Sequence, residues 1–227
     1  MKLLELQQVG VKYERNRKLF RRGTIQWVFH DLSFVLRRGD SLGVIGENGA
    51  GKSTLLRLMA GIIDPDEGRV INHGATTALM NLAGGFYPEL NGEQNILLGG
   101  VLMGFSEREV REKLDDIIAF AELGENINKP VSTWSGGMRS RLGFSLAAML
   151  DADVLLIDEV LAVGDKNFRE KCHTLMCERI RSQQTVVYVS HNESSVAELC
   201  NQALWIDGGA IRALGPSAEV VAQYMAC

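Results

Sequence analysis

The sequence predicts an α/β fold with a glycine-rich loop between a strand and a helix, and three features of the chain support this. The stretch GENGAGKST, residues 46–54, follows the apolar run 41–45 and precedes a helical pattern. Further along, short continuous apolar runs alternate with amphipathic helical patterns, as in a parallel sheet buried on both faces. With 227 residues, 46% hydrophobic content and 24 glycines, the chain can also bury a substantial core.

The elements are expected in a definite order along the chain. Residues 1 to about 90 alternate short β patterns with turns, interrupted by a helix near 52–61. The next region is helical, with a 3.6-residue apolar period over 107–123. Three strands and two helices should follow, at 154–157, 165–182, 185–189, 193–200 and 203–206. We therefore expect one domain, 1–227, with a core at about 1–90 and 151–227 and a helical subdomain at about 91–150.

Residues 46–54 have the spacing of a P-loop, in which glycines let backbone N–H groups turn toward phosphate oxygens. An ordinary strand-to-helix turn also uses glycine, but here the lysine, the paired hydroxyls and the strand-loop-helix context agree. We expect Lys52 to reach the β- and γ-phosphates and Ser53 to place its hydroxyl on Mg²⁺, aided by the helix dipole. The residues expected to bind the nucleotide are Gly46, Asn48, Gly49, Ala50, Gly51, Lys52, Ser53 and Thr54.

Two of the later apolar strands end in polar residues. Asp158 and Glu159 directly follow the strand 154–157, where a strand-end acid could simply face water. Beside a P-loop, however, Mg²⁺ needs oxygen ligands and a hydrolase needs a group that activates water, so Asp158 is the expected metal ligand and Glu159 the expected base. His191 follows the strand 185–189, and we expect it to contact the γ-phosphate or the water.

The segment WSGGM, residues 134–138 and called the signature segment below, predicts a second anion site. Ser135 is a suitable N-cap, and Gly136 and Gly137 leave backbone N–H groups exposed at the start of a helix. One nucleotide cannot easily use two separate helix N-termini of one compact chain. If the second site serves a neighbouring copy, two nucleotides are sandwiched between two protomers.

The segments GENGAGKST, WSGGM, LLIDE and SHN, in this order, resemble those of ATP-binding-cassette ATPases. The resemblance implies a RecA-like parallel-sheet core, an N-terminal antiparallel β subdomain and a helical subdomain, with ATP and Mg²⁺ as cofactors. It also implies a homodimer in which Ser135, Gly136 and Gly137 cap the γ-phosphate bound by the partner protomer. Asp165 then lies in the loop that crosses the interface. Tyr13 would stack on adenine, although an aromatic residue near a first strand more often belongs to the core.

One departure and one closer resemblance refine this interpretation. Most family members have a glutamine at the join to the helical subdomain, whereas the segment 79–90 has none and offers Asn81 as a weak substitute. The segments LAGGFYPELNG, SGGMRSRLGFS and DEVLAVGDKNFREKC resemble ATPases that export polysaccharides such as O-antigen, capsule and teichoic acid. That branch implies ATP hydrolysis at the cytoplasmic face of the bacterial inner membrane, with two copies of a membrane-spanning permease as partners.

The same branch implies a polysaccharide substrate and a permease contact through the helical subdomain and residues 86–88. The chain ends at Cys227, so we expect no C-terminal carbohydrate-binding domain. No apolar leader and no run of about 18 apolar residues is present, so a membrane role requires a partner subunit. The rival function is a soluble cassette ATPase acting on nucleic acid or ribosomes. The net charge of −4 argues against nucleic-acid binding, and the length leaves no room for the coiled coil or second cassette usual in that class.

Two further segments have competing interpretations. Residues 14–30 mix five cations with apolar side chains, and form either a solvated hairpin or a short amphipathic element at the membrane face, near anionic head groups or a pyrophosphate-linked glycan. Cys172, His173 and Cys177 could suggest a metal, but Cys172 fits the apolar face of a helix better. The four cysteines have no C-x-x-C spacing, as suits reduced thiols.

Overall fold

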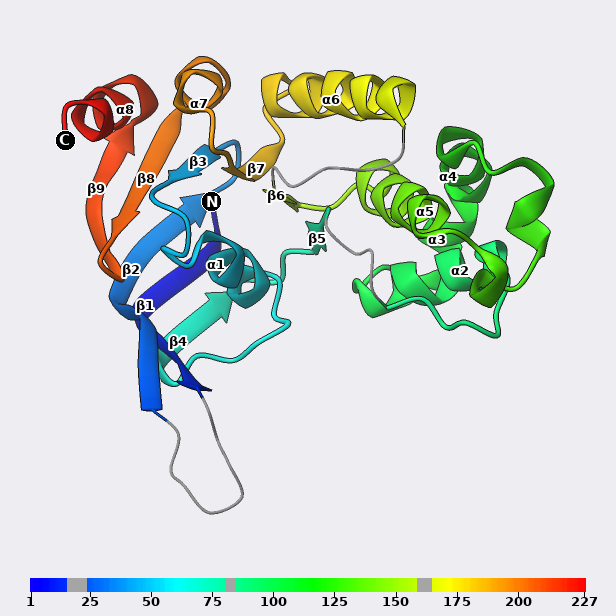
Figure 1. Cartoon of the computed structure of the whole chain (residues 1–227), viewed down its shortest axis with the longest axis horizontal. Coiled ribbons are helices and arrows are strands. Elements are labelled where there is room, and N and C mark those ends of the chain that lie inside the picture. The colour runs from blue at the N-terminus through cyan, green and yellow to red at the C-terminus, as the bar shows by residue number, and fades with distance from the viewer. Residues whose placement is uncertain (16–23, 81–84, 159–164) are drawn as a thin grey trace.

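The computed structural model describes residues 1–15, 24–80, 85–158 and 165–227 (Figure 1). Its described strands form two sheets. A three-stranded antiparallel sheet has the order β2-β1-β4, and a six-stranded sheet has the order β5-β6-β7-β3-β8-β9. The strands are β1 (Lys2–Arg15), β2 (Thr24–Arg37), β3 (Ser41–Ile45), β4 (Glu67–Asn72), β5 (Thr77–Leu79), β6 (Val154–Asp158), β7 (Thr185–Val189), β8 (Gln202–Asp207) and β9 (Ala210–Pro216). In the larger sheet, neighbouring strands run parallel from β5 through β6, β7 and β3 to β8, and β9 pairs antiparallel with β8.

The predicted parallel sheet buried on both faces is confirmed. Every residue of β3, β6 and β7 is buried. Because side chains alternate along a strand, each of these strands contributes to two cores. Leu155, Ile157, Val186 and Tyr188 pack with α5 to α8, whereas Val154, Leu156, Val187 and Val189 pack with α1 and the antiparallel sheet. The continuous apolar runs in the sequence therefore reflect helices on one face and a second sheet plus a helix on the other.

The helices gather in three places (Figure 1). Helix α1 lies beside the antiparallel sheet, α6 to α8 cover the opposite face of the parallel sheet, and α2 to α5 form a group at the far end of the molecule. Their bounds are α1 (Lys52–Met59), α2 (Gly92–Leu102), α3 (Glu107–Glu112), α4 (Leu114–Ala121), α5 (Gly136–Met149), α6 (Lys166–Arg181), α7 (Glu193–Leu199) and α8 (Ser217–Met225). None of the helices in the described part of the chain combines the length and apolar character needed to cross a bilayer.

The region 107–123, over which the sequence shows a helical apolar period, is divided into the two helices α3 and α4. The backbone N–H of Lys113 donates to Val110 O, three residues earlier, and so tightens the chain between the two helices. Lys113 also forms an ion pair with Asp151, at 3.0 Å. The apolar period survives the break, since Val110, Ile117 and Ala121 are all buried.

The segment 14–30 is partly described. Its flanks form a hairpin, because β1 and β2 pair antiparallel as far as Arg15 and Thr24. Phe29 is fully buried in the core, so the membrane-facing alternative is wrong for this side chain, while Ile25 is exposed. The cations and apolar residues at 16–23 lie outside the described residues, and both interpretations of them stay predictions.

Helix α7 approaches β3 so closely at Gly43 that this position has no room for a side chain. A Cβ atom at this position would lie 2.2 Å from Cγ1 of Val196 on α7. We expect Gly43→Ala to lower the free energy of unfolding by about 1–3 kcal/mol, because the added methyl overpacks the contact. Urea denaturation measures the change. The control is Gly215→Ala, where a Cβ would meet Val220 at an ordinary 3.9 Å. Equal stability of the two variants would contradict the expectation.

Candidate nucleotide-binding site

The predicted P-loop joins the end of β3 to the start of α1. Gly46, Asn48, Gly49, Ala50 and Gly51 lie in the loop, and Lys52, Ser53 and Thr54 form the first turn of the helix. Two glycines are required by space as well as by conformation. Gly46 has φ +148° and a Cβ there would lie 2.3 Å from Ile206 O, while Gly51 has φ +94° and a Cβ there would lie 2.5 Å from the Phe29 ring. Only glycine fits these two close approaches.

The start of α1 has the charge expected of an anion site. Lys52 is 5% exposed, and its ammonium donates to the carbonyl oxygens of Gly46, at 2.6 Å, and Glu47, at 2.9 Å. These bonds hold the cation against the loop. The first turn of the helix contains no acidic residue, and no side chain among the described residues caps its N-terminus, where the N-cap is Gly51. The positive end of the helix dipole therefore adds to the charge of Lys52.

Ser53 and Asp158 come together as the sequence predicts. The Ser53 hydroxyl donates to Oδ2 of Asp158 at 2.7 Å, although the two residues are far apart in the chain. Asp158 is the last residue of β6 and is 5% exposed, whereas Ser53 is exposed beside it. A hydroxyl and a carboxylate at the carboxyl end of a parallel strand are the hard oxygen ligands that Mg²⁺ prefers, so the pair fits this ion.

The neighbouring strand brings His191 to the same edge. Strands β6 and β7 pair in parallel with Asp158 opposite Val189, and exposed His191 lies two residues after the end of β7. The two strands are thus neighbours, and their carboxyl ends lie at one edge of the sheet. The predicted base Glu159 and the substitute residue Asn81 lie outside the described residues, so their roles stay predictions.

The signature segment starts α5, as predicted. The Ser135 hydroxyl accepts a hydrogen bond from Met138 N–H at 3.2 Å and so caps the helix. Gly136 is exposed, and no described heavy atom lies within 4 Å of where its Cβ would be. Packing within the described chain therefore does not require glycine here. The open backbone is available to a ligand or to a second protein.

Within one chain, α5 and α1 belong to different parts of the molecule. Helix α5 packs against α2, α4 and β5, whereas α1 packs against β5, β6 and β7. Figure 1 shows α1 beside the antiparallel sheet and α5 within the group of helices at the far end. The structure therefore groups the P-loop with Asp158 and places the signature segment elsewhere.

The structure also describes Asp165 and Tyr13, the two remaining predicted site residues. Asp165 caps α6, accepting a hydrogen bond from Phe168 N–H at 3.0 Å, and forms an ion pair with Arg141 of α5. The Phe168 bond, with a contribution from Arg141, holds the pKa of the Asp165 carboxyl below its ordinary value. Tyr13 is half exposed on β1, next to the stretch of β2 whose Phe29 touches the loop at Gly51.

The sequence interpretation missed Asn95, a buried polar residue of α2. Its side-chain amide donates to the carbonyl oxygens of Tyr87, Leu90 and Asn91, and its Oδ1 accepts from Tyr87 N–H at 2.8 Å. Asn95 thus fixes the loop 87–91, which contains two of the three residues expected to contact a permease. In this region, the feature that a short sequence pattern could reveal is the capping box that Asn91 and Gln94 form at the start of α2.

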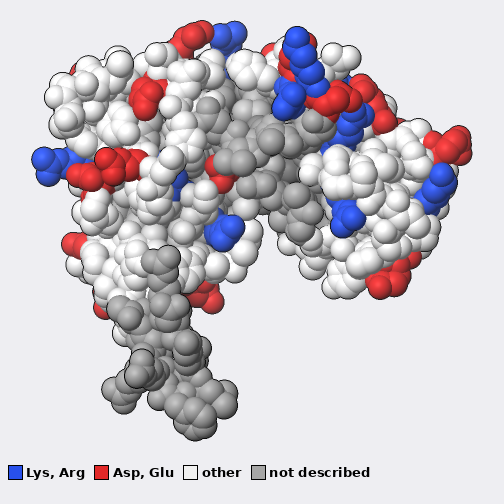
Figure 2. Space-filling model, viewed as in Figure 1, with Lys and Arg blue, Asp and Glu red and all other residues white. Residues whose placement is uncertain are grey.

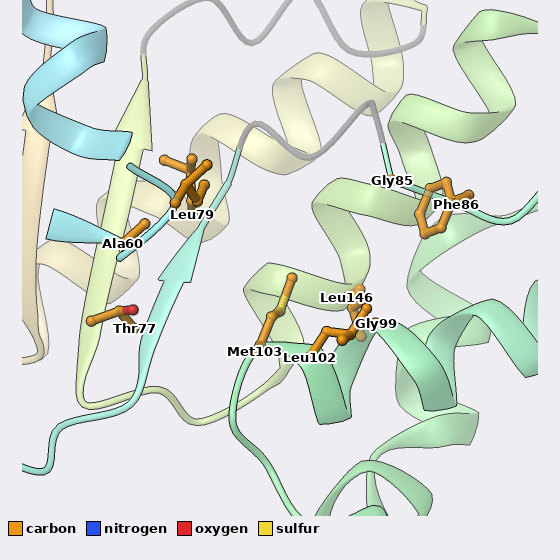
Figure 3. A pocket seen from close by; sticks show the side chains of 10 residues that line it. Ala60, Thr77, Leu79, Gly85, Phe86, Gly99, Leu102, Met103 and Leu146 are labelled. Carbon is orange, nitrogen blue, oxygen red and sulfur yellow. The ribbon is translucent and has the colours of Figure 1, made fainter. Parts of the chain in front are cut away.

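Beside that loop lies an apolar cavity of about 210 Å³ between the sheet and the helical group. Figure 3 shows Ala60, Thr77 and Leu79 on one side and Leu102, Met103 and Leu146 on the other. Leu102 and Ile62 line the cavity and are exposed, Leu102 to 70%. Tyr87 and Val101, each next in the chain to a lining residue, are exposed as well. Such a group of exposed apolar side chains is typical of an interaction site.

Cys172 lies on the apolar face of α6, as predicted. Its side chain is buried, and burial raises the pKa of its thiol to about 12. His173 and Cys177 are neighbours on another side of the helix, with Sγ 3.8 Å from Nδ1. Cys172 is therefore a packing residue.

Comparison with known proteins adds to this geometry. Residues 29–162 match the ABC transporter family. The chain is 41% identical to the O-antigen export system ATP-binding protein RfbB of Myxococcus xanthus, over 94% of this chain and 49% of the relative. It is 42% identical to the protein of the same name from Klebsiella pneumoniae, over 86% and 79%. The teichoic acids export ATP-binding protein TagH of Bacillus cereus is 38% identical, over 98% and 42%. The chain thus spans half or less of the Myxococcus and Bacillus proteins.

Solved structures share the fold. A dimeric post-hydrolysis state of the ATP-binding cassette MJ0796, bound to ADP and Pi, superposes with a TM-score of 0.73 at 19% identity, covering 95% of this chain and 99% of that one. The ATP-binding subunit of an ABC transporter superposes with a TM-score of 0.75 at 22% identity, covering 98% and 93%. At these identities the likeness concerns the fold, which is the predicted cassette architecture.

Proposed function

Because the chain belongs to the ABC transporter family, we propose that it is the ATP-hydrolysing subunit of a transporter that exports polysaccharide across the bacterial inner membrane. The observation that carries the proposal is the 41–42% identity to O-antigen export ATP-binding proteins over 86–94% of the chain. The identity to a teichoic acids export protein supports the same substrate class. The relatives reported above favour export over a soluble ATPase acting on nucleic acid or ribosomes.

The charge distribution also favours export over nucleic-acid binding. On the face shown in Figure 2, the Lys and Arg side chains of the described residues are interspersed with Asp and Glu side chains and form no single basic patch. The whole chain has a net charge of −4. A protein that follows nucleic acid usually presents a continuous basic surface.

The proposed chemistry assigns each residue of the site a role. The P-loop N–H groups and Lys52 would bind the phosphates, and Ser53 and Asp158 would hold Mg²⁺, which would neutralise negative charge on the phosphates. Glu159, next in sequence to Asp158, orients the attacking water and takes its proton. His191, at the same sheet edge, contacts the γ-phosphate. Tyr13 stacks on the adenine ring.

We further propose that the active form is a homodimer. The signature segment lies apart from the P-loop of its own chain, and Ser135, Gly136 and Gly137 leave the N-terminus of α5 open. In a head-to-tail pair, this end of α5 would cap the γ-phosphate held by the partner's P-loop. Asp165, also exposed, would face the same interface. ATP binding would then close the dimer and hydrolysis would release it.

The apolar cavity beside residues 87–91 is the proposed contact with a membrane-spanning permease. A cytoplasmic helix of the permease would bury the exposed side chain of Leu102 and cover the cavity, as in other helix-in-groove contacts. Asn95 would hold the adjoining loop in shape for this contact. Two permease copies would serve the two protomers, and the chain would then lie peripherally at the cytoplasmic face of the inner membrane.

Deleting the gene tests the proposed function. Cells without it should lose surface polysaccharide and retain the lipid-linked or capsular polymer inside, and wild-type protein should restore export. Restoration of export by the Lys52→Ala variant, or unchanged surface polysaccharide in the deleted strain, would contradict the proposal. Sedimentation of the protein with ribosomes instead of membranes would favour the soluble rival.

Replacing Leu102 by glutamate tests the permease contact. The buried charge should prevent docking in the apolar cavity, so the protein should no longer co-purify with the permease from detergent-solubilised membranes. ATP hydrolysis by the purified protein should stay near wild type, because Leu102 belongs neither to the P-loop nor to the Ser53–Asp158 pair. The matched control is Leu214→Glu, an exposed leucine on β9. Normal co-purification of the Leu102 variant would contradict the proposal that the permease docks at the cavity.

A further inference from the structure

An ion pair joins the first half of α5 to the start of α6. Arg141 of α5 donates from Nη2 to Oδ2 of Asp165, the N-cap of α6. The other carboxylate oxygen, Oδ1, accepts from Phe168 N–H at 3.0 Å. Each oxygen of Asp165 therefore has its own donor, and two donors fix the rotation of a carboxylate as well as its position.

Arg141 is supported from two further sides. Its guanidinium lies over the ring of Phe168, 4.8 Å from the centroid, and its Nη1 lies 3.9 Å from Oε2 of Glu122, just after α4. The Arg141 side chain is 18% exposed, whereas that of Asp165 is 63% exposed. The cation is thus a shielded support, and the carboxylate it holds is at the surface.

We propose that Arg141 is a positioning residue, which fixes Asp165 relative to Ser135 so that both meet the partner's nucleotide as one rigid unit. The proposal rests on the sandwich dimer described under the proposed function. Ser135 and Arg141 are on the same helix, so a fixed Asp165 keeps a fixed relation to the signature segment. Without Arg141, the start of α6 would no longer be held to α5. The two helix starts would then have to be positioned separately each time the dimer closes, and misplaced groups slow the reaction.

The test is steady-state ATP hydrolysis by the purified full chain with Arg141→Gln. We expect kcat to fall about 10-fold or more, within the roughly 100-fold that a small misplacement of catalytic groups costs. The ATP concentration dependence should lose its cooperativity. Nucleotide binding to the monomer should be unchanged, because the P-loop and Lys52 are untouched. Arg141→Lys, which keeps the charge but not the planar fork of donors, should recover part of kcat.

Lys171→Gln is the matched control for a merely structural effect. The Lys171 ammonium donates to Oε1 of Glu122 at 2.6 Å and to Phe120 O at 3.1 Å, so it too ties α4 to α6. Among the described residues, however, Lys171 forms no hydrogen bond or ion pair with Asp165. If the joint between the helices were all that mattered, both variants would lose the same activity. We expect Lys171→Gln to keep cooperative hydrolysis near wild type.

A double-mutant cycle decides whether Arg141 acts through Asp165. Asp165→Asn keeps an oxygen that can cap α6 but removes the charge that pairs with Arg141. In this background, Arg141→Gln should lower kcat little further. Fully additive losses would overturn the proposal, as would wild-type kcat and cooperativity in Arg141→Gln alone. Non-cooperative hydrolysis by a wild-type monomer would overturn the dimer itself, and the proposal with it.

Discussion

Replacing Glu159 with glutamine should stop ATP turnover while ATP binding continues. The amide keeps the size and shape of the side chain, and the Ser53–Asp158 pair that fits Mg²⁺ is unchanged. What is lost is the group that takes a proton from water, a contribution of about 10²- to 10⁴-fold in rate. If ATP closes the dimer and hydrolysis opens it, closed dimers should accumulate.

The measurement combines steady-state ATP hydrolysis with size-exclusion chromatography in the presence and absence of ATP. The variant should elute as a dimer with ATP and as a monomer without it. Glu219→Gln, a change at an exposed carboxylate on α8, is the control and should behave as wild type. Turnover by the Glu159 variant within a few-fold of wild type would show that another group is the base.

The features that the sequence predicted well are those with local causes. A buried parallel strand needs apolar residues on both faces, so the strands at 154–157 and 185–189 could be recognised from continuous apolar runs alone. The P-loop needs glycine where the backbone turns closely past Ile206 O and the Phe29 ring, and the spacing of those glycines is visible in the sequence. The Ser53–Asp158 contact followed because carboxyl ends of parallel strands share one edge.

The features that were missed depend on contacts between distant parts of the chain. The break between α3 and α4 at Lys113 left the apolar period intact, so periodicity could not reveal it. Asn95 is polar in a helix, and only the folded loop 87–91 gives its amide partners. The Arg141–Asp165 pair joins two helices separated by β6, and no local pattern distinguishes Arg141 from the other arginines of the sequence. Charge alone does not reveal such a partner.

Replacing Ser135 with arginine should abolish hydrolysis and leave nucleotide binding to the monomer nearly intact. In the proposed dimer, the N-terminus of α5 must approach the γ-phosphate held by the partner, and a long side chain at its cap would fill that space. The P-loop of the same chain lies in another part of the molecule and should bind ATP as before. Binding and turnover should therefore separate, and ATP should no longer induce dimers even when Glu159→Gln is added.

The substitution also removes a helix cap, so its control must do the same elsewhere. Ser106 caps α3 through a capping box with Glu109, and Ser106→Arg should cost a similar 0.5–2 kcal/mol or so of stability without touching the nucleotide. Fluorescent-nucleotide titration, ATP hydrolysis and thermal unfolding of the two variants give the comparison. Both variants lose a helix cap. A loss of hydrolysis in Ser135→Arg that Ser106→Arg does not share would therefore come from the position of the signature segment. Joint loss of binding and turnover in that variant, at normal thermal stability, would place the signature segment and the P-loop in one site of a single chain and would contradict the sandwich dimer.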